Sequence, residues 1–231
     1  MDAQEIAIQE KSKEAQKFIA RVYGWMAAAL ILSGFCAWYT TVNPAIFNLV
    51  WGTKYGFYIM MGLELGLVFI ISLAIKKLSV FMASLLFILY SIVNGVTLSS
   101  IFLVFDITSI GNCFFIAAAM FAVMSVYGYI TKSDLTSFGR YFSMALIGLI
   151  IASLVNFFLK SEKFDWILSI VSIIIFTGLT AYDTQKITKA SAYADDSDVF
   201  KKAAIIGALE IYLDFINIFL NLLRLFGKSK R

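Results

Sequence analysis

The stretch from Ala203 to Phe226, AAIIGALEIYLDFINIFLNLLRLF, determines how we interpret this chain. It is as apolar as a membrane span, yet it carries five polar residues at spacings of four, three, four and three: Glu210, Asp214, Asn217, Asn221 and Arg224. These spacings place all five on one stripe of a helix. A charged side chain near the bilayer centre costs about 3 kcal/mol or more, so such residues usually face a cavity or a partner. We therefore predict a central polar helix with the other helices of a membrane protein packed around it.

The composition of the whole chain agrees with a membrane protein. Of its 231 residues, 61% are hydrophobic and 15% are charged, and the mean hydropathy is +0.85. Soluble domains carry about a quarter charged residues and under half apolar ones. The sequence predicts an all-α integral membrane protein with one transmembrane domain, residues 21–231, after a polar cytoplasmic segment, residues 1–20.

Seven apolar segments make up the predicted transmembrane domain. They span residues 22–42, 55–75, 80–105, 110–130, 141–159, 166–183 and 203–226. The connections are short except for a loop predicted at 184–202, which contains the acidic run Asp195-Asp196-Ser197-Asp198. This run lacks the glycine and the terminal glutamate of an EF-hand, so we interpret it as a solvated loop.

The distribution of Lys and Arg among the loops indicates the orientation of the chain. With the N-terminus inside, the inner segments carry twelve of these residues and the outer ones seven. Cytoplasmic loops are enriched in Lys and Arg, so we predict a cytoplasmic N-terminus. Seven full crossings would place the basic C-terminal tail outside, whereas a seventh segment that re-enters would bring it inside, and the sequence leaves both open.

Missing residues and motifs exclude several classes of function. The chain has no histidine, which excludes His-ligated haem, Ser-His-Asp triads and histidine-based pH switches. Cys36 and Cys113 lie in apolar runs without a metal-binding motif. Nucleotide-binding and HExxH motifs are absent, and no stripe of Lys, Arg and aromatic residues indicates nucleic acid. We expect neither an enzyme nor a tightly bound cofactor.

Few charged residues lie deep inside the apolar segments. Glu64 sits in the GxxxG sequence at 62–66, whose small residues let helices approach closely, so we expect it to contact a neighbouring helix. Asp183 ends the sixth segment, and Asp214 lies eleven residues into the seventh. Because these two helices run antiparallel, both acids approach from the cytoplasmic side. For the acids to touch, the seventh helix must extend inward by a turn or two.

Two neighbouring carboxylates in a medium of low dielectric constant cannot both ionise cheaply, so Asp183 and Asp214 would share one proton. Such a pair could open a path or bind a cation when it loses that proton. Hard cations such as calcium take several oxygen ligands, which Glu210 and Asn217 could help to supply. Hydrogen bonding between helices is the structural alternative for all of these residues.

Two stretches resemble the Bax inhibitor-1 (transmembrane Bax inhibitor motif) family: TGLTAYDTQKI at 177–187 and GALEIYLDFINIFLNLLRLFG at 207–227. The seven-span layout, Glu64 and the NGVTL stretch at 94–98 agree with them, and the resemblance is closer to bacterial than to animal members. It implies six helices around the C-terminal one, in a bacterial inner membrane. It also implies a pH-sensitive calcium leak, with Asp183 and Asp214 as a di-aspartyl pH sensor and calcium site.

The same resemblance implies a closing latch, formed by a basic residue at the inner end of the second helix. The bacterial pattern has arginine there, whereas this chain has Lys76 and Lys77, and either could be the latch. A lysine lacks the bidentate grip of arginine on a carboxylate. The resemblance further links some bacterial members to inhibition of a membrane-bound protease.

Three functions fit these observations. The first is a passive calcium leak channel gated by protonation of Asp183 and Asp214. The second is a proton-coupled cation antiporter that uses the same carboxylates. The third is a membrane-embedded modulator of a membrane protease or other partner, without transport, which would contact that partner through residues 1–21. The lipid bilayer is an expected partner in all three, and calcium ions and protons are expected in the first two.

Overall fold

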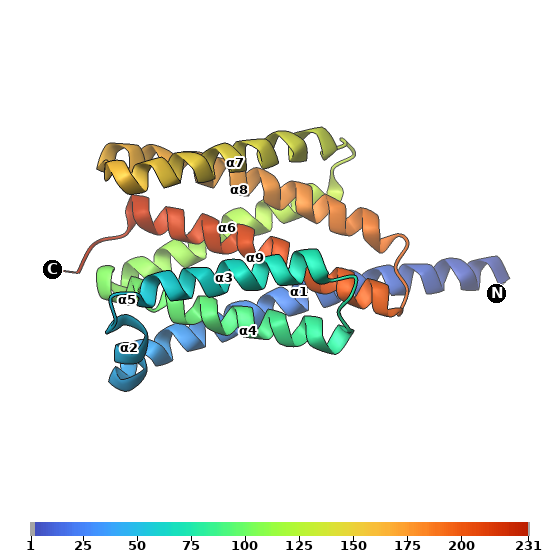
Figure 1. Ribbon diagram of the computed structural model, residues 1–231. Helices are drawn as coiled ribbons and strands as arrows, with labels where there is room; N and C mark the ends of the chain where they lie inside the picture. Colours follow the sequence, from blue (N-terminus) through green and yellow to red (C-terminus); the bar gives the residue numbers. More distant parts are fainter. Residues whose placement is uncertain (1–2, 231) are drawn as a thin grey trace. The chain divides into compact units, whose positions relative to one another are not determined.

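The computed structural model describes residues 3–230, and no β-strand forms within that range (Figure 1). Helices account for nearly all of it, which confirms the predicted all-α class. They are α1 (Ala3–Val42), α2 (Pro44–Trp51), α3 (Gly56–Ala74), α4 (Val80–Leu98), α5 (Ile101–Val104), α6 (Ile107–Ile130), α7 (Thr136–Leu159), α8 (Glu162–Ser191) and α9 (Asp198–Phe226).

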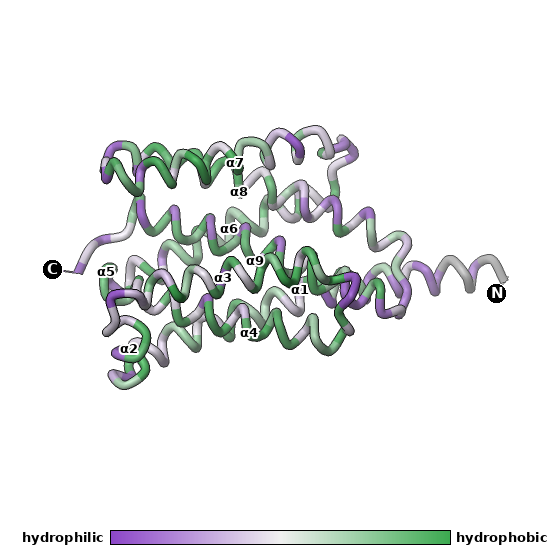
Figure 2. The backbone as a smooth tube through the Cα atoms, in the orientation of Figure 1, coloured by the Kyte–Doolittle hydropathy of each residue, from purple (hydrophilic) through white to green (hydrophobic). Residues whose placement is uncertain are grey.

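Seven helical segments among the described residues are long and apolar enough to cross a membrane, which confirms the predicted number of spans. They are Gln9–Val42, Gly56–Ala74, Val80–Val104, Ile107–Ile130, Thr136–Leu159, Glu162–Ser191 and Asp198–Phe226. In Figure 2, hydrophobic residues follow α7 along most of its length. Only 11% of the apolar window of α7 is buried by the rest of the chain, as expected for a helix that faces lipid.

The last of these spans, in α9, is the most enclosed. Its apolar window is 67% buried, whereas those of the other six are between 11% and 39% buried. Tyr212, Ile211 and Ile218 are completely covered. Among the seven described spans, the polar C-terminal one is thus the most buried, which agrees with the central place predicted for it.

The prediction of a loop at 184–202 was wrong in its extent, because most of these residues are helical. Helix α8 continues to Ser191 and α9 begins at Asp198, which leaves a loop of residues 192–197. Beyond Asp183, α8 becomes amphipathic: Ile187 and Ser191 are buried, while Lys186 is exposed. Hydropathy alone ends the segment where polar residues begin, whereas packing of the buried face keeps the helix intact. The acidic residues Asp195 and Asp196 are exposed, as predicted for a solvated loop.

The chain forms two compact units. The described part of the first unit, called here the α1–α4 unit, comprises residues 3–104, 190–209 and 230. The second, called the α6–α8 unit, comprises residues 105–189 and 210–229. Helix α9 contributes its first half to one unit and its second half to the other.

Close helix packing in the α1–α4 unit centres on α4, which packs against both α1 and α3 (Figure 1). A Cβ atom added at Gly95 would clash with the carbonyl oxygen of Ser33, so the backbones of α4 and α1 touch there. By contrast, a Cβ at Gly62 or Gly66 would meet no described atom within 4 Å. The two glycines of the GxxxG sequence therefore make no close contact with another described helix.

In the α6–α8 unit, glycines and aromatic rings hold the helices together. A Cβ at Gly128 of α6 would overlap with the carbonyl oxygen of Ala181 of α8, so these backbones are in contact. The ring of Phe215 on α9 packs edge-on against Phe114 and Phe121 of α6, with centroids 5.3 and 5.8 Å apart. These contacts position α8 and the second half of α9.

Candidate functional site

Asp183 and Asp214 lie together in the α6–α8 unit. Asp183 is on α8 and Asp214 is on the second half of α9, and their side chains are 8% and 3% exposed. The two carboxyl groups interact directly, and that of Asp214 also lies against the hydroxyl of Thr180, one turn before Asp183. We call these two residues the aspartate pair.

The hydrogen bonds around Asp214 leave room for a proton. Thr180 Oγ1 donates to the carbonyl oxygen of Phe176 at 2.8 Å. A hydroxyl has a single proton to donate, so while that bond lasts Asp214 can bond to Thr180 only as the donor, in its protonated form. Oδ2 of Asp214 has no hydrogen-bond partner among the described residues. An unpartnered buried oxygen is costly, and a proton or a bound cation would each remove that cost.

An ion pair lies one helical turn from the aspartate pair. Lys186 Nζ is 2.6 Å from Glu210 Oε1, and this contact joins α8 to α9. Lys186 follows Asp183 by three residues, and Glu210 precedes Asp214 by four, so both fall on the same faces as the acids. Both charges interact electrostatically with Asp183. Our sequence reasoning found Glu210 but missed Lys186, although the matching one-turn spacings were a signal for the pair.

The other predicted site residues lie elsewhere. Glu64 is in the α1–α4 unit, where its Oε1 accepts a hydrogen bond from Asn94 Nδ2 of α4 at 3.3 Å. It therefore does contact a neighbouring helix, as expected. Asn217 is on α9 in the α6–α8 unit, and its Nδ2 donates to the carbonyl oxygen of Leu213 in the same helix at 2.8 Å. The side-chain oxygen of Asn217, Oδ1, therefore stays available to bind an ion, whereas Nδ2 is used within the helix.

The two latch candidates, Lys76 and Lys77, are exposed residues of the α1–α4 unit that follow α3. Neither side chain forms an ion pair within the part of the chain that the structure describes. The carbonyl oxygens of Lys76 and Leu78 accept hydrogen bonds from Lys202 Nζ of α9, at 3.5 and 3.0 Å. The latch role stays a prediction for both lysines.

Acids in the loops are held differently from the aspartate pair. Lys189 Nζ donates to Asp134 Oδ1 at 2.6 Å, and this hydrogen bond is the main reason that the pKa of Asp134 is lowered to about 2. Hydrogen bonds from Arg21, and then from Lys201, lower the pKa of Asp196. These exposed carboxylates are ionised at neutral pH and already have cationic partners.

Within residues 3–230, no group of three or more His, Cys, Asp or Glu side chains has the geometry to hold a metal ion. The aspartate pair supplies two carboxylates, and calcium takes six to eight oxygen ligands in resident protein sites. What the pair can do chemically is exchange a proton and attract a cation that keeps part of its water shell.

Comparisons with known proteins extend over nearly the whole chain. Residues 15–231, which include both aspartates, match the family described as "Inhibitor of apoptosis-promoting Bax1". The inner membrane protein YbhL of Escherichia coli (strain K12) is 46% identical over 217 residues, 93% of each chain. An uncharacterized protein of Borreliella burgdorferi is 45% identical over 215 residues, again 93% of each chain. RP147 of Rickettsia prowazekii, also uncharacterized, is 41% identical over 93% of this chain and 91% of its own.

Proposed function

The chain belongs to the family of inhibitors of apoptosis-promoting Bax1, the Bax inhibitor-1 family, and on that premise we propose that it is a pH-sensitive calcium leak channel. It is a multi-pass membrane protein similar to a bacterial inner membrane protein. In this proposal, protonation of Asp183 and Asp214 gates the leak, and calcium is the cargo. We propose no catalytic activity and no resident cofactor.

The observation that carries this proposal is the burial of two interacting carboxyl groups, one of which has an oxygen without a hydrogen-bond partner in the described part of the chain. When two carboxyl groups adjoin at a site of low dielectric constant, loss of both protons is opposed by charge repulsion and by desolvation. A purely structural hydrogen bond between helices would be served better by one acid and one amide. A pair of acids responds to pH.

Gating follows from the charge at the site. At low pH the pair keeps a proton, and the nearby Lys186 and Glu210 cancel each other, so the site holds little negative charge. At higher pH the pair loses this shared proton, carries two negative charges and attracts a divalent cation. Because few ligands surround that cation, it is bound weakly enough to leave again, which a leak requires.

The decisive experiment measures calcium flux into proteoliposomes that contain a calcium-sensitive dye, from about pH 6 to about pH 8. We expect the wild-type leak to rise with pH, and we expect Asp183→Asn and Asp214→Asn to lose this dependence because an amide does not titrate in this range. Asp198→Asn, which alters an exposed aspartate at the start of α9, is the matched control. If both mutants of the pair leak like the wild type at every pH, the proposal is wrong.

The same vesicles separate a leak from a proton-coupled antiporter. A proton gradient imposed across the membrane would drive calcium against its own gradient in an antiporter. A leak channel moves calcium only downhill. If calcium moves uphill, the protein is an antiporter rather than a leak channel. The aspartate pair would remain the proposed site in that case.

Lys76→Gln and Lys77→Gln test the proposed latch. Loss of a cation that holds one aspartate in the closed state should raise the leak at low pH in one of the two mutants. If neither mutant changes the leak at low pH, the latch is not formed by these lysines.

A second candidate function, modulation of a partner protein, is favoured by the length of α1. Its 40 residues extend over about 60 Å, roughly twice the thickness of the hydrocarbon core. The polar residues 9–13 near its start are exposed. Deletion of residues 1–21 should abolish an effect on a membrane protease while leaving calcium flux unchanged; loss of flux as well would contradict a separate role.

A further inference from the structure

A polar pocket lies at the other end of α8 from Lys186, in the α6–α8 unit. Its volume is about 760 Å³, which is within the range of small-molecule sites. The pocket forms where α7 ends at Leu159 and the chain reverses through Lys160, whose left-handed conformation (φ 51°) permits the turn into α8. Asn156 caps this turn by accepting a hydrogen bond from the backbone N–H of Ser161 at 3.2 Å. We call this cavity the α8 pocket.

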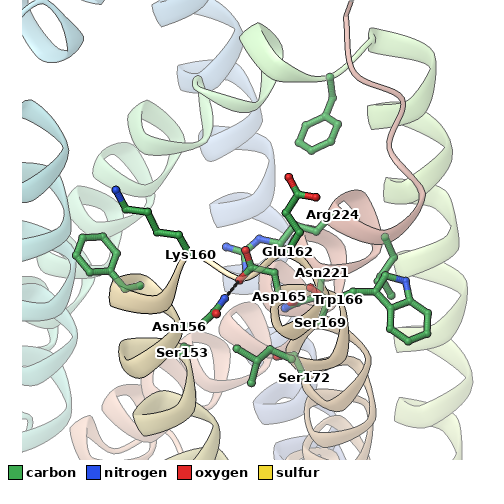
Figure 3. A pocket seen from close by; sticks show the side chains of 14 residues that line it. Ser153, Asn156, Lys160, Glu162, Asp165, Trp166, Ser169, Ser172, Asn221 and Arg224 are labelled. Atoms are coloured by element: carbon green, nitrogen blue, oxygen red, sulfur yellow. Dashed lines mark hydrogen bonds between the residues drawn. The ribbon is translucent and has the colours of Figure 1, made fainter.

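The α8 pocket is lined by side chains of both charge signs: Lys160, Glu162, Asp165 and Arg224 (Figure 3). Within residues 3–230, none of these four side chains forms an ion pair. Asp165 is oriented by Asn156, whose Nδ2 donates to it at 2.6 Å. Two cations and two anions thus line one cavity without neutralising one another, an arrangement that suits a ligand that itself carries both charges.

Two serines of α8, both largely buried as residues, also line the α8 pocket. Ser169 and Ser172 are 2% and 6% exposed, and neither forms a hydrogen bond within the described residues. Helical serines usually donate to a carbonyl oxygen one turn earlier, as Ser143 of α7 does to Gly139 at 2.8 Å. Because both side chains line the cavity, their hydroxyl groups can donate to a ligand there.

The position of the α8 pocket points to the source of the ligand. It lies at the ends of three predicted spans, α7, α8 and α9, where each would meet the membrane surface. Trp166 and Phe157 line it as well, and tryptophan is enriched at the level of lipid headgroups. The pocket therefore combines polar groups for a headgroup with apolar walls for the glycerol and acyl part of a lipid.

We propose that the α8 pocket binds a zwitterionic phospholipid with a primary ammonium group, of the phosphatidylethanolamine type. Arg224 binds the phosphate, Glu162 and Asp165 bind the ammonium group, and Lys160 adds positive charge at the edge of the cavity. The hydroxyls of Ser169 and Ser172 donate to phosphate or ester oxygens. An ammonium group with three N–H donors satisfies carboxylates better than a quaternary ammonium, which has none. The positive charges of Lys160 and Arg224 would repel a metal cation from the α8 pocket.

The test uses the purified full-length protein in detergent and measures lipid binding by native mass spectrometry. We expect phosphatidylethanolamine to bind about tenfold more tightly than phosphatidylcholine, phosphatidylglycerol or water-soluble phosphoethanolamine, a ratio equivalent to one charge-assisted hydrogen bond. Arg224→Gln and Glu162→Gln should each weaken binding of phosphatidylethanolamine by about tenfold. Both residues are exposed, so the variants should fold.

Arg140→Gln is the matched control, since Arg140 is an exposed arginine in the first half of α7 and does not line the α8 pocket. It should bind lipid like the wild type. Equal binding of phosphatidylglycerol and phosphatidylethanolamine, with no effect of Glu162→Gln, would reduce the site to a phosphate site and overturn the proposal. If water-soluble phosphoethanolamine binds equally tightly, the ligand is not a lipid. If both pocket variants bind phosphatidylethanolamine like the wild type, the lipid does not bind in the α8 pocket.

Discussion

Each compact unit of this protein holds acids inside predicted spans, but it holds them differently. In the α1–α4 unit, Glu64 is half-buried, accepts a hydrogen bond from the amide of Asn94 and also bonds to the hydroxyl of Thr97. In the α6–α8 unit, Asp183 and Asp214 are buried beside each other, and one Asp214 oxygen has no hydrogen-bond partner among the described residues. An acid paired with an amide is satisfied in either protonation state, whereas two adjoining acids are balanced only when they hold a proton or a cation.

The glycines of the two units show a parallel difference. Gly62 and Gly66 flank Glu64 in a pattern typical of helix contacts, yet neither is close to another part of the described chain. Gly128 has no such pattern around it, but α6 and α8 touch there at Ala181, two residues before Asp183 on α8. A motif indicates where helices could approach closely, and the fold decides where they do.

The largest effect that we predict separates the two kinds of acid. Asp214→Asn should abolish the pH dependence of calcium flux, whereas Glu64→Gln should lower the flux at most and leave its pH dependence intact. The reason is that glutamine can keep the hydrogen bond to Asn94, while asparagine cannot exchange the shared proton. Flux measured in proteoliposomes at several pH values checks this, and an equal loss of pH dependence in Glu64→Gln would erase the distinction between the units.

The next effect concerns packing beside the aspartate pair. Gly128→Ala forces a methyl group against the backbone of α8 and should destabilise the protein by about 3 kcal/mol. Gly66→Ala has open space and should be neutral, or stabilising by up to about 1 kcal/mol through helix propensity. Thermal unfolding in detergent measures both. Similar midpoints for Gly128→Ala and Gly66→Ala would show that the α6–α8 contact is not as close as described.

A smaller effect is expected from the ion pair next to the aspartate pair. At about pH 8, Lys186→Gln should raise the calcium flux and Glu210→Gln should lower it, each by about fivefold, because a partly exposed charge contributes about 1 kcal/mol. The double mutant should return close to the wild-type flux. Changes in the same direction for both single mutants would rule out simple electrostatic attraction of the cation.

The smallest effect is predicted for the ion pair of Asp134 and Lys189. The hydrogen bond from Lys189 lowers the pKa of Asp134 to about 2, below the usual value of about 3.9. Its contribution to stability is therefore complete above about pH 4 and is lost only as the pH falls through about 2. Asp134→Asn should leave the pH profile of flux between about pH 6 and pH 8 unchanged, and a shifted profile would place a second pH sensor in this loop.

Sequence reasoning reached the main features of the candidate site but not its surroundings. The proximity of Asp183 and Asp214 was predicted from antiparallel helices, on the condition that the seventh helix extends inward by a turn or two. Helix α9 is longer than predicted at its N-terminal end, since it begins at Asp198 rather than near Ala203. Lys186, the partner of Glu210, was missed because it lies in the region predicted as a loop. The three-residue spacing from Asp183 to Lys186 places the two on one face only if that region is helical.

The amino-acid sequence by itself determined the number of spans, the all-α class and the identity of the intramembrane acids. These depend on the composition of windows of about twenty residues, which is a local property. Only the tertiary structure decided that Lys186 joins Glu210, that Gly128 rather than Gly66 makes the close contact, and that charges of both signs line the α8 pocket. Those contacts depend on how each helix is rotated and shifted against its neighbours, and packing between segments far apart in the chain sets both.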